Sequence, residues 1–195
     1  MKKLMMVAAM MLMSMGAFAQ NEVGQFTLKP MVGIDLSTIT NDDNKMKVGL
    51  AAGVEGEYGI TETFGVSAGI LFAMQGAKDK DIKDWKMNTT YLNIPILANA
   101  YLFKGFAVKV GIQPGFLLSA KEKYTENNVS VEVDAKSVMN KVDFTIPIGI
   151  SYEYQSFVID ARYNWGLTKV YKDDNRNSKS KNSVFMFTVG YKFAL

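Results

Sequence analysis

Hydrophobic and polar residues alternate along most of this chain with a period of two. Between Phe157 and Thr168 the odd positions are aromatic or aliphatic, and the even positions are mostly polar and include Asp160 and Arg162. Because successive side chains of a β-strand point to opposite faces, this period predicts a strand with one apolar and one polar face. The same alternation recurs eight times from about residue 25 onward. We therefore expect eight strands.

The two rows of side chains differ sharply in charge. The apolar rows contain no charged residue and are interrupted only by Pro30, Gly56 and Pro114. The opposite rows hold five basic and five acidic residues, namely Lys29, Asp35, Lys47, Glu55, Glu57, Lys109, Glu153, Asp160, Arg162 and Lys192. Each segment runs about 10 to 13 residues, which is the length that a tilted strand needs to cross a bilayer.

The connections between these segments alternate in length. Tight turns occur at ITETF, LFKGF and YQSF, whereas the other connections are longer and polar, the longest being residues 120–141. Short turns on one side and long loops on the other are typical of an outer-membrane barrel. The pattern predicts an all-β protein, an eight-stranded antiparallel up-and-down transmembrane β-barrel over residues 20–195, with both termini on the periplasmic side.

The period alone does not tell which row meets lipid. If the apolar row faced inward, the chain would be a soluble, lipocalin-like periplasmic carrier. The polar row is rich in Gly and small residues, which suit the crowded interior of an eight-stranded barrel. Aromatic residues gather near both ends of the apolar rows, as expected at the two bilayer interfaces. They are Tyr58, Phe64, Phe106, Tyr154, Phe157 and Phe193 by the short turns, and Phe72, Phe116, Trp165 and Phe185 toward the long loops.

On the membrane interpretation, the charged residues of the polar rows point into the barrel lumen. Buried charges persist only when they are paired. We therefore predict a lumenal charge network, and the alternative is that water at the barrel end solvates these groups. Its members are Glu55, Glu57, Lys109, Glu153, Asp160, Arg162 and Lys192. Pro95, Pro114 and Pro147 lie inside three predicted strands, where each is expected to mark a bulge or a bend.

The first 20 residues have the features of an export signal. Lys2 and Lys3 precede an apolar run that is too short to span a membrane, and Ala17-Phe18-Ala19 forms a small-x-small cleavage site. Residues 1–19 are therefore predicted to be a signal peptide. Removing two of the three excess positive charges leaves a net charge of +1, which argues against nucleic-acid binding.

The composition argues against an enzyme. The chain contains no His and no Cys, so it lacks the usual general base and any His/Cys metal site. No catalytic residue, cofactor or metal site is predicted. An eight-stranded barrel is also filled by its own side chains, so an open pore is not expected.

Three stretches resemble the strand motifs of a known family. YLNIPIL (91–97), VGIQPGFLLSAK (110–121) and DARYNWGLTKV (160–170) are similar to the Bacteroidota-type outer-membrane β-barrel family, often called porin-family or PorT-like. The resemblance covers residues 25–195 and implies an eight-stranded barrel that the barrel-assembly machinery inserts in the outer membrane. Asn93 departs from the Glu that is common there, and the chain ends in Leu195 rather than Phe.

Surface positions suggest where partners bind. The last long loop has an excess of basic residues that could contact phosphates of outer-membrane lipopolysaccharide, or simply face water. Trp85, in the second loop, is a candidate interaction or interfacial anchor. The candidate residues are Trp85, Lys169, Lys172, Arg176, Lys179 and Lys181.

Three functions stay open on this evidence. The first is a small integral outer-membrane protein with a structural or surface-interaction role. The second is a PorT-like accessory component of a protein secretion apparatus, and the third is the soluble carrier.

Overall fold

The structure is a computed structural model that describes residues 23–40, 44–79, 85–126, 129–172 and 179–195. The predicted signal peptide, 1–19, and Arg176 lie outside these residues. The strands are β1 (Phe26–Ile39), β2 (Asn44–Thr61), β3 (Phe64–Asp79), β4 (Trp85–Asn93), β5 (Ile96–Phe103), β6 (Phe106–Glu126), β7 (Val129–Asp134), β8 (Val142–Tyr154), β9 (Phe157–Gly166), β10 (Asn182–Tyr191) and β11 (Phe193–Ala194). In the part of the chain that the structure describes, no helix is long and apolar enough to span a membrane.

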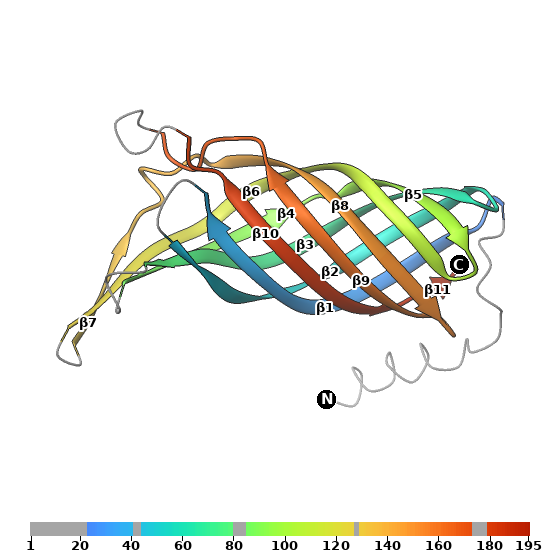
Figure 1. The fold of residues 1–195 in the computed structure, drawn as a ribbon, viewed down its shortest axis with the longest axis horizontal. Helices are drawn as coiled ribbons and strands as arrows, with labels where there is room; N and C mark the ends of the chain where they lie inside the picture. The colour runs from blue at the N-terminus through green and yellow to red at the C-terminus, as the bar shows by residue number, and fades with distance from the viewer. Residues whose placement is uncertain (1–22, 41–43, 80–84, 127–128, 173–178) are drawn as a thin grey trace.

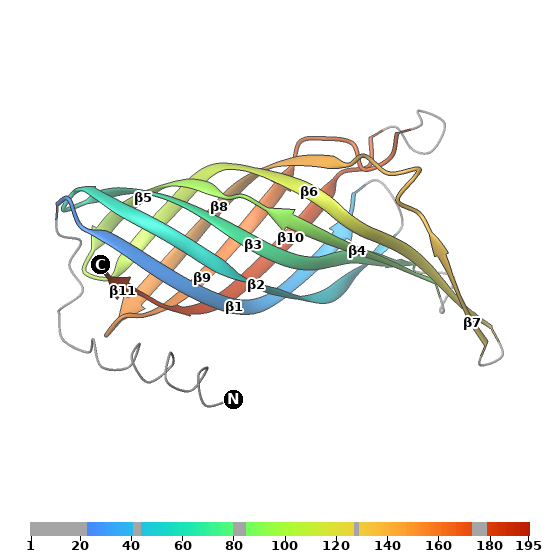
Figure 2. The same ribbon diagram turned by 180° about the vertical axis from the view of Figure 1, so that it is seen from behind.

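The strands form a closed antiparallel ring (Figures 1 and 2). β4 and β5 are two parts of one crossing, as are β10 and β11, and β7 pairs only with β6. The ring therefore has eight crossings, as the sequence pattern predicts. It closes where β1 pairs with β10 between Met31 and Ile39.

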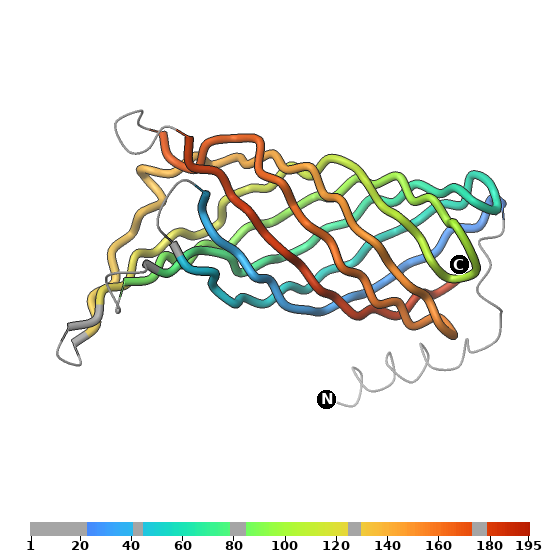
Figure 3. The backbone as a smooth tube through the Cα atoms, viewed as in Figure 1, coloured from blue at the N-terminus to red at the C-terminus, as the bar shows by residue number. Residues whose placement is uncertain are grey.

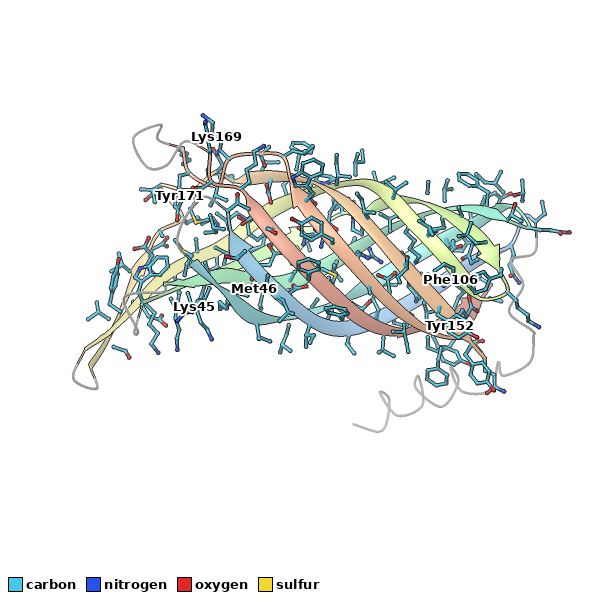
Figure 4. The ribbon with its side chains drawn as sticks, in the orientation of Figure 1. Lys45, Met46, Phe106, Tyr152, Lys169 and Tyr171 are labelled. Carbon is cyan, nitrogen blue, oxygen red and sulfur yellow. The ribbon has the colours of Figure 1, made fainter. Side chains whose placement is uncertain are left out.

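The apolar rows face outward and the charged rows face the lumen. Val32 is 65% exposed and Leu50 is 62% exposed, whereas Glu55, Asp160 and Arg162 are at most 3% exposed. The membrane interpretation is confirmed, because an outer wall of this kind needs hydrocarbon around it. A soluble carrier required the opposite orientation, with the apolar row lining a cavity. Both predicted groups of aromatic residues lie on the outer wall, and Figure 4 shows Phe106 and Tyr152 near one end of it.

The two ends of the barrel differ as the connection lengths predict. Turns of two residues each join β2 to β3, β5 to β6 and β8 to β9. We call this end the turn end, and the opposite one the loop end. β1 begins and β11 ends at the turn end (Figure 3).

The prolines behave differently from one another. Pro95 breaks the fourth crossing into β4 and β5, as expected. Pro147 and Pro114 lie in unbroken strands, and the register of β8 with both neighbours runs in step through them. Of the two expected alternatives, a bulge or a bend, the bulge is therefore absent at these two sites. Pro147 pairs with Asn164 of β9 but has no partner in β6. The hydrogen bond that proline cannot donate is therefore missing on the β6 side only.

The longest predicted loop, 120–141, is largely a β-hairpin. β6 continues through Glu126 and pairs with β7, and both strands project beyond the barrel (Figure 1). The ends of β2, β3 and β4 pair alongside them. We call residues 44–46, 77–79, 85–88, 121–126 and 129–134 the extended sheet.

Candidate functional site

The centre of the lumen holds a network of ion pairs, which we call the central network. Arg162 donates to both carboxylate oxygens of Asp160, at 2.7 and 2.9 Å, and its Nη2 also donates to Glu55 Oε2 at 3.1 Å. Lys29 Nζ lies 2.9 Å from Glu55 Oε1. Lys109 Nζ lies 3.1 Å from Asp160 Oδ2 and 3.4 Å from Glu55 Oε1. All five side chains are almost completely buried.

The central network joins opposite walls of the barrel. Glu55 lies on β2, whereas Lys109 lies on β6 and Arg162 on β9, each three strands away from β2 in the ring. Such contacts are possible only across the lumen, not between neighbouring strands. The ion pairs therefore close the barrel in cross-section.

A second group of charges lies nearer the turn end. Lys192 Nζ lies 2.8 Å from Glu153 Oε2 and 3.6 Å from Glu57 Oε2. Tyr101 donates a short hydrogen bond to Glu57 and accepts one from Lys192 at 3.2 Å. The two groups together hold four acids and four bases, so the charges within these two groups balance.

The structure places all seven predicted network residues in these two groups. Sequence reasoning left out Lys29 and Tyr101. Lys29 lies on the polar row directly opposite Glu55, so its parity was a usable signal. Tyr101 also shares the lumenal parity of Asn99. It was not predicted as a network member because only charged residues were considered.

An apolar cluster, the apolar cap, closes the lumen at the loop end. Met87, Tyr91 and Leu117 project into it from the wall, and Met139 and Val170 come from the connections that follow β7 and β9. Backbone hydrogen bonds tie these connections together, since Asn140 N donates to Val170 O at 2.9 Å and Lys172 N to Val138 O at 3.0 Å. Buried charges thus occupy the centre of the lumen, and buried apolar side chains occupy its loop end.

Trp85 is not the exposed loop residue that the sequence suggested. It begins β4, pairs with Tyr124 of β6 and packs half-buried against the apolar cap. The error arose because β4 starts earlier than expected, which turns Trp85 toward the cluster.

Two basic residues of the last loop, Lys169 and Lys172, bond to the connection that follows β7. Lys172 Nζ donates to Ser137 O at 2.7 Å, and Lys169 O accepts from Asn140 at 2.8 Å. Lys179 is exposed and Lys181 is half-buried. Figure 4 shows Lys169 at the loop end, well away from Lys45.

A closed ring of eight crossings with an apolar outer wall and charges in its lumen defines a small outer-membrane β-barrel protein. The chain belongs to the outer membrane protein β-barrel domain family, whose profile matches residues 18–172. This match does not distinguish a Bacteroidota-type or PorT-like subgroup. A search of curated protein sequences finds no match.

Solved structures support the same fold. The attachment invasion locus protein Ail of Yersinia pestis is similar with a TM-score of 0.53 and 17% identity, over 88% of this chain and 100% of Ail. The structure of Ail in complex with the heparin analogue sucrose octasulfate gives a TM-score of 0.54 and 16% identity over the same shares.

Proposed function

We propose that this protein is a non-conducting, non-enzymatic outer-membrane anchor whose extended sheet makes contacts outside the cell. The blocked lumen is the observation that carries the proposal. Ion pairs join opposite walls at the centre, and the apolar cap lies at the loop end, so described side chains occupy the lumen at two levels. An eight-stranded barrel is in any case just wide enough for side chains.

The extended sheet is the part available to partners. Among the described strands, β7 pairs with β6 alone, so it is an edge strand. Val131 and Val133 on β7 are 54% and 50% exposed. An exposed edge of this kind can accept an added strand from another polypeptide.

The orientation is part of the proposal. The loop end faces the exterior and the turn end, with both termini, faces the periplasm, since outer-membrane barrels have short periplasmic turns and longer outer loops. We also propose that the predicted signal peptide directs export and that the barrel-assembly machinery inserts the protein into the outer membrane. Lipopolysaccharide would then surround the loop end.

Conductance measurements test the blocked lumen. The purified protein in a planar bilayer should give no stepwise current, while a 16-stranded porin in the same bilayer serves as the positive control. Regular single-channel steps from the unmodified protein would contradict the proposal.

Site-specific photocrosslinking tests the contact surface. A photoreactive residue at Val131 or Val133 on intact cells should give discrete protein adducts, because these side chains are exposed on the free strand. The matched control is Ile148, which is similarly exposed but faces lipid. Equal adduct patterns at Val131 and Ile148 would count against a role for β7.

A further inference from the structure

Four lysines lie side by side across four neighbouring strands of the extended sheet. The register places Lys45 of β2 opposite Lys78 of β3, Lys78 opposite Lys86 of β4, and Lys86 opposite Lys123 of β6. We call these four residues the basic row. Neighbouring strands lie about 4.8 Å apart, so the row is about 15 Å long.

The basic row lies on the outer face of the sheet. Ala77 and Met87 are completely buried on the inner face, so their neighbours Lys78 and Lys86 point outward. Lys45 and Lys86 are exposed, and Lys78 and Lys123 are half-buried. Figure 4 shows Lys45 at the loop end, on the outside of the barrel.

The arrangement is unfavourable by itself. Like charges directly opposite one another destabilise a sheet. Among the residues that the structure describes, none of the four ammonium groups has a salt bridge within 4.0 Å. Glu132 of β7 ends the row opposite Lys123, but its carboxylate pairs with Lys121 at 3.2 Å. Between the described residues, therefore, no ion pair relieves the repulsion inside the row.

The row lies just beyond the last outward apolar residues of β3 and β6, where lipid headgroups are expected. Met74 on β3 and Leu118 on β6 are outward apolar residues, 44% and 43% exposed, and no described outward apolar residue follows them on these strands before the row. Lys78 comes four positions after Met74, about 10 Å further along the barrel axis at ordinary strand rise and tilt. Flexible lysine stems reach back toward the apolar boundary from there.

We propose that the basic row binds the phosphate groups of the glycolipid headgroup in the surrounding outer leaflet, the lipid A part of lipopolysaccharide. This rests on the proposed outward orientation of the loop end. The charge complementarity is direct, because a linear set of ammonium groups at headgroup height meets a polyanionic surface. The lipid also stays adjacent to this wall of the barrel, whereas a soluble anion has to be captured from dilute solution.

Lipid titration of a charge-neutral variant tests the proposal. The folded protein in a nonionic detergent is titrated with diphosphorylated lipid A or with dephosphorylated lipid A, and bound lipid is counted by native mass spectrometry. The row variant carries Lys45→Gln, Lys78→Gln, Lys86→Gln and Lys123→Gln. The control variant carries Lys104→Gln, Lys121→Gln, Lys136→Gln and Lys141→Gln, which removes the same charge outside both the basic row and the last loop.

The row variant should bind diphosphorylated lipid A at least about tenfold more weakly than wild type, since each lysine near an anionic surface contributes a few-fold. The control variant should bind within about twofold of wild type. Dephosphorylated lipid A should bind wild type and row variant equally. Equal lipid A affinity in the row variant and wild type would overturn the proposal, as would a loss confined to the control variant.

Thermal unfolding gives a readout that a misfolded variant would not imitate. Without lipid, the row variant should unfold at the same temperature as wild type or higher, because like-charge repulsion is removed. Diphosphorylated lipid A should raise the unfolding temperature of wild type only. If inorganic phosphate or sucrose octasulfate stabilises wild type through the row and lipid A does not, the ligand is a soluble anion and the lipid assignment is wrong. Photocrosslinking at Val131 is independent of the row, so failure here leaves the proposed function standing.

Discussion

Arg162 is the residue on which the central network depends most directly. Its guanidinium bonds Asp160 on its own strand and Glu55 on the far wall, and no lysine could make all three hydrogen bonds in one plane. Gly149, opposite Arg162 on β8, leaves the space that the side chain fills, because a Cβ there would lie 2.6 Å from Arg162 Cβ.

Replacing Arg162 with Leu should therefore lower the free energy of unfolding by about 3–5 kcal/mol, the usual cost of leaving a buried charge without its partner. The measurement is urea-induced unfolding in detergent micelles, followed by tryptophan fluorescence. Changing Lys121, whose pair with Glu132 is exposed, to Leu should cost at most about 1 kcal/mol. Similar losses in both variants would show that the central network stabilises the fold no more than an exposed ion pair does.

The members of the lumenal network could be predicted because parity alone decides whether a side chain faces the lumen. Their partners could not. Glu55 and Arg162 belong to strands that are not neighbours, and which residues meet across the lumen depends on the shear of the ring, which a single sequence does not reveal. The composition of the apolar cap was hidden for a similar reason, because Met139 and Val170 come from connections with no regular alternation.

Among the elements, the β8–β9 turn shows the clearest local strain. Gln155 and Ser156 adopt φ values of 48° and 68°, the left-handed region that hairpins of two residues require. Asn and Gly adopt this conformation most readily, and neither is present here.

The double change Gln155→Asn and Ser156→Gly should raise the free energy of unfolding by about 1 kcal/mol. Urea-induced unfolding in micelles measures it, and refolding should remain complete. The control is Ser151→Gly in β8, where the backbone is extended and glycine should destabilise. A neutral or negative effect in the turn would contradict the assignment of strain.

The number of strands, the row of side chains that faces outward and the three short turns were predictable, because each follows from the period of two and from turn chemistry. The extended sheet was not, since VSVEVD in β7 is a short alternating run inside a polar segment. A bulge near Leu118 also shifts the faces of β6, so that Ser119 faces outward and Ala120 inward. The alternation read from Phe106 to Leu118 therefore does not continue into the extension.

For the whole molecule, the two faces of the wall should differ in access to lipid. Nitroxide labels at Ile148 and Val189, which are 47% and 51% exposed, should collide freely with oxygen dissolved in the bilayer. A label at Val184, which is 1% exposed on the same strand as Val189, should be shielded. If the label at Val189 were shielded and the label at Val184 were accessible to oxygen, the apolar row would face the lumen, which would contradict the structure.

The junction of first and last crossings gives the barrel a built-in order of opening. β10 pairs with β1 through nine residue pairs, and β11 pairs with β1 through two. Lys29 and Pro30, which lie between these two registers, have partners in β2 but none in β10 or β11. A force applied at Leu195 would thus first detach β11 from β1, and detachment would then stop at Tyr191, where β10 ends. Peeling of the longer register beyond that point would require much greater force, so the molecule should yield in two mechanical steps.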